Sequence, residues 1–169
     1  MISTKEVIDR AREYFVPEKV RMKRRAIRFV RKAAEEVGVP CQQISECMWR
    51  AACPEKQGFI VKLDMLAHEH FVVLVAFAGI ITDRELIGRD LPIALLEFNQ
   101  RFAYGSFRLD ELKQGLSVVL GYLCDIRRCD GTHVSDAARE MIAEMQRSLV
   151  ELYARDLIIL PYYPSSQHV

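Results

Sequence analysis

The segment from residue 95 to residue 110 constrains the fold more than any other part of this 169-residue chain. Apolar residues recur at helical spacing up to and through its first half, namely Leu91, Leu95, Phe98 and Phe102. Gly105 follows, and glycine readily takes the left-handed backbone conformation that ends many helices. Phe107 and Leu109 then resume the pattern at period two, which is typical of a strand. The segment therefore predicts a helix that ends at a glycine and passes directly into a strand.

The chain before this junction predicts helices followed by three strands. The helices span residues 5–15 and 18–37, and a proline separates them. Residues 43–52 have a weak strand pattern, whereas residues 59–65 alternate between apolar and mostly polar side chains, as a half-buried strand does. The run at 71–81 is apolar on both faces, which indicates a central strand with something covering each side.

The chain after the junction predicts a hairpin and a long helix. The helix that ends at the glycine is expected to begin with Asp90 as its cap. Strands are predicted at 106–111 and 116–125, and the short segment between them suits a hairpin. Ser135 is expected to cap a last helix that runs to about residue 155 with an apolar stripe on one face. Residues 157–164 are too apolar to be left in water, so they are expected to dock on the body or on a second chain.

The composition is that of one globular domain. Hydrophobic residues make up 50% of the chain, and glycine and proline are few. Residues 1–164 are therefore predicted to form a single domain, with a basic helical arm at 1–37 and a frayed tail at 165–169. Residues 1–40 carry eleven Lys and Arg against six Asp and Glu, whereas the remainder carries thirteen against seventeen. A basic arm thus precedes an acidic body.

The cysteines and the apolar runs indicate the cellular compartment of the protein. The five cysteines are Cys41, Cys47, Cys53, Cys124 and Cys129. Their number is odd and the chain is large enough to fold without crosslinks, so free thiols in a reducing compartment are expected. No apolar run approaches the roughly 18 residues of a membrane span, and the first residues lack the apolar segment of a secretory signal. A cytoplasmic protein with no membrane partner is therefore predicted.

The predicted order of elements is helix, three strands, helix, two strands, helix, which is an α+β domain with an antiparallel sheet covered by helices. This order and the junction resemble the type III secretion chaperone-like fold, and within it the YbjN family of bacterial proteins. In that family a helix with a Leu-x-x-Leu-Asn pattern runs into Gly-x-Phe-x-Leu-Asp. The corresponding residues are Leu95-x-x-Phe98-Asn99 and Gly105-Ser106-Phe107-Arg108-Leu109-Asp110. A phenylalanine at 98 in place of the usual leucine and the long basic arm are departures from the family.

The resemblance implies a binding protein without catalytic residues. Secretion chaperones of this fold are typically homodimers that hold an unfolded stretch of a client protein, and YbjN-like proteins are labelled regulators. The resemblance therefore implies a chaperone-like or adaptor protein, and a homodimer, that binds a protein or peptide client. The first strand and the helix around Phe98 and Phe102 are candidate binding surfaces, although both phenylalanine side chains are also expected core residues.

The basic helix supports an alternative from a different class. Residues 19–32 carry eight cations and no acid. On a helix, five of these cations form one continuous face: Arg21, Arg24, Arg25, Arg28 and Lys32. Such a face suits the phosphates of a nucleic acid, and Phe29 is the only aromatic residue among them, so binding would be electrostatic and without sequence preference. A solvated helix face, or one that meets the acidic body of a second subunit, explains the same cations.

Enzyme activity is not expected. The chain has no glycine-rich phosphate loop, no Gly-x-Ser-x-Gly and no His-Glu-x-x-His, and no cofactor motif. His68 and His70 lie two apart, which on a strand puts both on one face, and a cysteine at 41, 47 or 53 could add a third zinc ligand, but this spacing matches no known signature. A metal or thiol enzyme is therefore the least favoured class. The sequence therefore favours a non-catalytic binding protein without a cofactor, with a nucleic-acid-associated regulator as the alternative.

Overall fold

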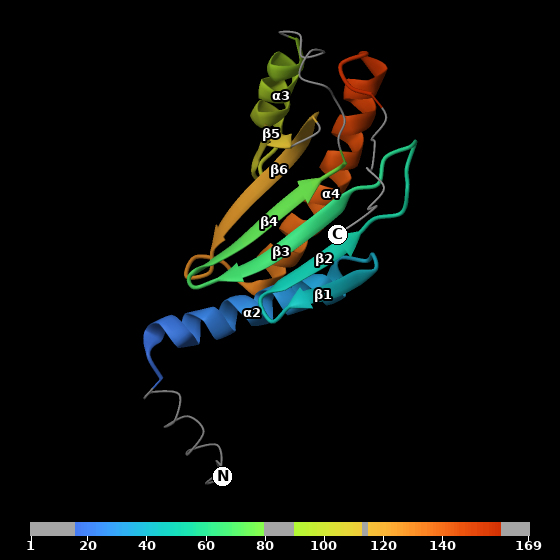
Figure 1. Ribbon diagram of the computed structural model, residues 1–169. Helices are drawn as coiled ribbons and strands as arrows, with labels where there is room; N and C mark the ends of the chain where they lie inside the picture. Colours follow the sequence, from blue (N-terminus) through green and yellow to red (C-terminus); the bar gives the residue numbers. More distant parts are fainter. Residues whose placement is uncertain (1–15, 80–89, 113–114, 160–169) are drawn as a thin grey trace.

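Residues 16–79, 90–112 and 115–159 are described by the computed structural model of the chain, in which a sheet lies against helices (Figure 1). The described helices are α2 (Glu18–Glu36), α3 (Asp90–Arg101) and α4 (Gly131–Ala154). The strands are β1 (Cys41–Ser45), β2 (Met48–Ala52), β3 (Lys62–His68), β4 (Phe71–Phe77), β5 (Ser106–Leu112) and β6 (Gly115–Asp125). The helix predicted at 5–15, the tail at 165–169 and most of the segment at 157–164 lie outside the described residues.

The strands form one six-stranded sheet in the order β1-β2-β3-β4-β6-β5. Every neighbouring pair is antiparallel. The predicted α+β class and antiparallel sheet are therefore confirmed. The doubly apolar run that begins at residue 71 supplies β4, which lies between β3 and β6 near the centre of the sheet, as predicted.

The single strand predicted at 43–52 is wrong, because this segment forms the hairpin of β1 and β2. The chain reverses at Glu46 and Cys47. The Cys47 N–H donates to Ser45 Oγ at 3.3 Å, and the strand register shifts between Gln43 and Ser45. A local side-chain hydrogen bond and a bulge thus turn the chain where the sequence pattern is weak. Four strands rather than three therefore precede α3.

The C-terminal half of helix α2 packs into the core. Ala26, Val30 and Ala33 are fully buried, and they recur at helical spacing. No residue from 18 to 25 is buried, and Figure 1 shows this half of the helix running out past the strands. The helix therefore docks by its C-terminal half.

Helix α4 begins one turn earlier than predicted. Asp130 caps it, because the Asp130 side chain accepts a hydrogen bond from the His133 N–H at 2.9 Å. Ser135, the predicted cap, is the fifth residue of the helix, and its hydroxyl donates to the carbonyl oxygen of Gly131 at 3.0 Å. The predicted apolar stripe is confirmed by the complete burial of Ala138, Met141, Met145, Leu149 and Leu152.

The junction between α3 and β5 forms as the sequence predicts. Gly105 has a φ of +102°, and a Cβ at this position would lie 2.2 Å from the carbonyl oxygen of Gly121. The side chain of Asn99 bridges the two elements, since it donates to the Phe107 carbonyl at 3.1 Å and accepts from the Phe107 N–H at 2.5 Å. The rings of Phe98 and Phe107 pack edge to face at a centroid distance of 5.5 Å. The glycine and the asparagine together fix the helix-to-strand turn.

The described helices pack on one face of the sheet (Figure 1). Five residues in register across the sheet point to this face, and all are buried: Ala51, Leu63, Ala76, Leu120 and Phe107. The opposite face carries none of the described helices. Cover on both sides of β4 was expected, and within the described residues it is present on one side only.

The cysteines divide into two groups. A disulfide joins Cys124 to Cys129, so the prediction of five free thiols is wrong for this pair. The Arg128 N–H donates to the Asp125 carbonyl at 3.0 Å, and this turn returns the chain toward the end of β6. Cys41, Cys47 and Cys53 are free. Burial raises the pKa of the Cys53 thiol to about 11, as expected of a small core residue rather than a reactive thiol.

Candidate binding surfaces

The helix-free side of the sheet presents an apolar surface, which we call the open face. One row of apolar side chains crosses four strands in register: Met48, Leu66, Val73 and Leu123. Val75 and Phe77 extend this row along β4. Leu66 is 37% exposed and Leu123 is 59% exposed, whereas Val73, Val75 and Phe77 are half-buried. The open face therefore has an apolar centre that water reaches.

Two ion pairs, both formed between residues of the sheet, flank the apolar centre of the open face. Arg50 Nε and Nη2 donate to the two carboxylate oxygens of Asp64 at 2.6 and 2.7 Å, and the Arg50 guanidinium lies 5.7 Å from the centroid of the Phe77 ring. On β5, Arg108 Nε donates to Asp110 at 2.8 Å. Each of these arginines is thus paired with a carboxylate, so the border adds little net charge to the open face.

The predicted aromatic binding residues lie on the other side of the sheet. Phe98 is fully buried, with its ring against Phe107 and under the Arg101 guanidinium, whose carbon is 4.3 Å from the ring centroid. Phe102 is half-buried and packs against Tyr104 at a centroid distance of 6.1 Å. Phe98 is therefore a core residue that offers no surface to a partner in this fold, and Phe102 offers only part of its ring.

The five cations predicted to form one face of α2 are split between two sides. Arg21, Arg24 and Arg28 are exposed, and within the described residues no carboxylate pairs with them. Arg25 is half-buried and turned toward the loop before α4, where its Nη2 donates to the Cys129 carbonyl at 3.5 Å. Lys32 is also half-buried, and its Nζ donates to Thr132 Oγ1 at 3.0 Å. Three of the five thus remain available to a ligand.

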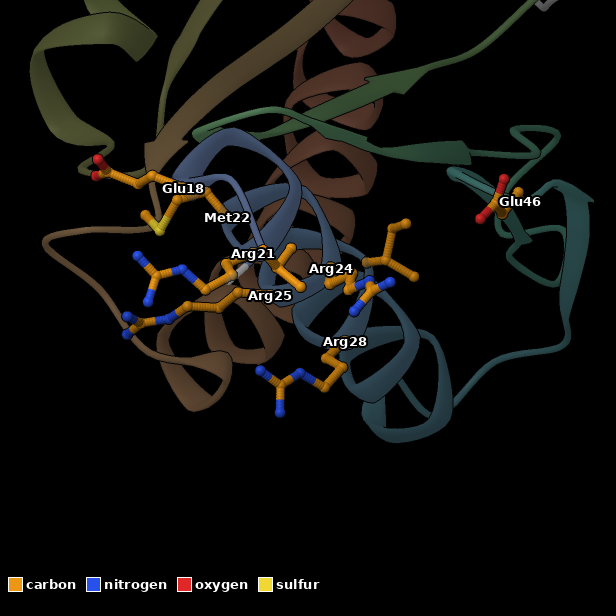
Figure 2. Close-up of a pocket in the computed structure, with 9 residues that line it drawn as sticks. Glu18, Arg21, Met22, Arg24, Arg25, Arg28 and Glu46 are labelled. Atoms are coloured by element: carbon orange, nitrogen blue, oxygen red, sulfur yellow. The ribbon is translucent and has the colours of Figure 1, made fainter. Parts of the chain in front are cut away.

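Two adjoining hollows run along the exposed side of α2, and we call them together the α2 groove. Figure 2 shows the first, with a volume of about 640 Å³, where arginine side chains extend from the helix on one side and Glu46 lies opposite. The second, of about 700 Å³, lies between α2 and the turns that follow β1 and β3. Arg24, Ile27 and Glu46 line both hollows. Leu66 of the open face lines the second hollow, so the two surfaces meet at this residue.

The groove has an apolar strip and a basic rim. Val20 and Ile27 lie on one side of the helix, and Cys47 faces them from the β1–β2 turn. Lys19 Nζ pairs with Glu69 at 2.5 Å and closes one end, and this bond holds the pKa of Glu69 below its usual range. The sequence did not predict the groove, because its walls come from segments that are distant in the chain.

Side-chain hydrogen bonds hold the loop between β6 and α4. Hydrogen bonds from the Arg127 side chain and N–H hold the pKa of Asp125 well below its usual range. Tyr122 Oη and His133 Nε2 are 2.8 Å apart, and burial raises the pKa of this tyrosine. Both contacts have structural explanations, since they hold the loop and the start of α4.

His68 and His70 lie in different elements and not on one strand. His68 is the last residue of β3 and is exposed, whereas His70 lies in the turn before β4. The two therefore do not share a strand face. In the part of the chain that the structure describes, no group of three or more His, Cys, Asp or Glu side chains is placed to hold a metal ion.

Comparison with known proteins agrees with this architecture. No protein-family model matches the sequence, and no curated protein matches it. Among solved structures, the crystal structure of YbjN, a proposed transcription regulator from E. coli, matches with a TM-score of 0.56. The match covers 77% of this chain and 93% of that chain at 13% identity. The chain thus has an α+β fold with helices against one antiparallel sheet, and that fold is YbjN-like, as the resemblance predicted. At this identity the likeness shows the fold alone.

Proposed function

We propose that the chain is a non-catalytic adaptor or chaperone-like protein that holds an apolar segment of a partner protein on the open face. The observation that carries this proposal is the in-register row of Met48, Leu66, Val73 and Leu123, two of which are more than a third exposed. Contiguous exposed apolar surface of this kind marks interaction sites.

The sequence of β4 supports the same reading. A central strand that is apolar on both faces is normally covered on both faces, and the described helices cover only one. A partner segment on the open face would supply the second layer. Because the bordering arginines are paired within the sheet, burial of apolar area, and not charge, would provide most of the binding free energy.

A regulator that contacts nucleic acid is the second candidate, in line with the description of YbjN. The observation that favours it is the exposed, unpaired state of Arg21, Arg24 and Arg28 within the described residues. The only aromatic residue of α2, Phe29, is half-buried beside Arg25, with the guanidinium carbon 5.2 Å from the ring centroid. It is therefore poorly placed to stack on a base, and we rank this candidate second.

Site-specific crosslinking tests the first proposal. A photoreactive amino acid at position 123 should capture a partner polypeptide in lysate of the native host, and mass spectrometry identifies it. Position 93 is the matched control, because Ile93 is a comparably exposed apolar residue, at 52%, on α3. Leu66→Glu should abolish the capture at 123. Equal capture at 123 and 93, or capture that nuclease removes, would refute a protein client on the open face.

Light scattering and the crosslink at position 123 together report the oligomeric state. We expect a homodimer of twice 19.5 kDa by light scattering at micromolar concentration. If the crosslink at 123 joins two copies of the chain, and Leu123→Glu yields a monomer, the open face is the dimer interface and not the client site.

A cytoplasmic location belongs to the same proposal. Within the described residues, no helix has the length and apolar character needed to cross a membrane.

A further inference from the structure

We infer that the α2 groove is a second binding site, which meets the open face at Leu66, for an acidic amphipathic peptide segment of a partner protein. The occupant carries carboxylates for the rim and apolar side chains for the strip. Lys23, Arg24 and Arg28 are exposed on α2, and no carboxylate in the described part of the chain pairs with them.

The groove carries more positive than negative charge. Three carboxylates line the two hollows, namely Glu18, Glu46 and Glu69. Glu69 is already paired with Lys19. The cations that line the hollows outnumber these carboxylates: Lys19, Arg21, Lys23, Arg24, Arg25 and Arg28. Cations that converge without partners repel one another, so an anionic ligand lowers the electrostatic free energy of this surface.

The apolar strip decides which anion fits. Val20 is 40% exposed and Ile27 is half-buried, and both line the groove beside the cations. They are seven residues apart on the helix, which is about 10 Å along its axis. A phosphate backbone would leave this strip in contact with water, whereas a peptide with apolar and acidic residues at helical spacing covers it. Acidic polypeptide is therefore favoured over nucleic acid.

The test measures binding to defined probes by fluorescence anisotropy with the full chain. The probes are a 15-residue peptide with Leu and Glu at helical spacing, an all-Glu peptide of the same charge, and a DNA duplex of the same charge, all at one ionic strength. We expect the Leu/Glu peptide to bind at least about tenfold more tightly than the other two probes. Tighter binding of the duplex would overturn the inference in favour of phosphate recognition, and absence of peptide binding up to millimolar concentration would overturn it altogether.

Matched variants locate the site. Arg24→Glu should weaken binding of the Leu/Glu peptide about tenfold, because Arg24 lines both hollows. Arg31→Glu makes the same charge change at another exposed position of α2 that lines neither hollow, and it should weaken binding less than about threefold. Equal losses in the two variants would mean that only the general field of the helix attracts the peptide.

Two further variants separate the strip from the open face. Val20→Asn should remove the advantage of the Leu/Glu peptide over the all-Glu peptide, since it makes the exposed part of the strip polar. Leu123→Glu, which alters the open face, should leave peptide binding unchanged. A loss of binding in Leu123→Glu would refute a separate site. Circular dichroism of each variant confirms that the helix content is retained.

Discussion

Replacement of Asn99 by alanine should destabilise the fold substantially, although this side chain belongs to a helix near an edge strand. The Asn99 amide donates to the Phe107 carbonyl at 3.1 Å and accepts from the Phe107 N–H at 2.5 Å, so it satisfies both backbone groups of one residue of β5. Each hydrogen bond contributes about 1 kcal/mol net, and the backbone groups of the buried Phe107 would be left poorly satisfied. We therefore expect Asn99→Ala to lower the free energy of unfolding by about 2–3 kcal/mol.

Urea denaturation followed by circular dichroism measures this loss as a lower midpoint at an unchanged slope. Gln100→Ala is the control on the same helix, because Gln100 is exposed, and it should change the free energy of unfolding by less than about 0.5 kcal/mol. Asn99→Asp keeps the acceptor for the Phe107 N–H but sets a charged oxygen against the Phe107 carbonyl. Equal midpoints for Asn99→Ala and Gln100→Ala would refute the claim that Asn99 holds α3 to β5.

Two further predictions concern the backbone and pH. Gly105→Ala should lower the free energy of unfolding by more than about 3 kcal/mol, because it combines a left-handed φ with a Cβ placed 2.2 Å from the backbone oxygen of Gly121; near-wild-type thermal stability would contradict this. Asp125→Asn should destabilise the protein at pH 7, and the difference from wild type should shrink as the pH falls below about 4, the ordinary range of an Asp carboxyl. Hydrogen bonds from Arg127 lower the pKa of Asp125 in the folded state. The stabilising contribution of the Asp125 carboxylate is therefore present above the pKa that this group has in the unfolded chain, and it is lost on acidification. A difference that stays constant down to pH 2 would contradict the Asp125 prediction.

The fold was largely predictable because its elements follow local patterns. Alternation at 59–65 predicted burial on one side, and Phe59, Val61, Leu63 and Met65 are each at most 1% exposed. The helix-to-strand junction at Gly105 was predicted for the same reason. The hairpin turn at Glu46 and the cap at Asp130 were missed because each depends on one side-chain hydrogen bond of a kind that neighbouring polar residues could also make.

The candidate surfaces were less predictable than the fold. An apolar residue such as Val73 gives the same sequence pattern whether a helix of its own chain or a partner covers it. The open face could therefore be recognised only from the structure. The α2 groove depends on the approach of Arg24 to the turn at Glu46. The sequence identified the cations, but it could not show that Arg25 and Lys32 turn toward α4.

The uneven docking of α2 has a consequence for its local stability. Its C-terminal half is held by buried Ala26, Val30 and Ala33, whereas residues 18–25 contribute no buried side chain. An isolated helix of two turns is marginal in water, so these turns persist as an extension of the docked half. Their amides should exchange with solvent through local fraying and not through global unfolding. A ligand in the α2 groove would therefore slow amide exchange at 18–25 first, while the amides of β3 and β4 continue to report the stability of the whole domain.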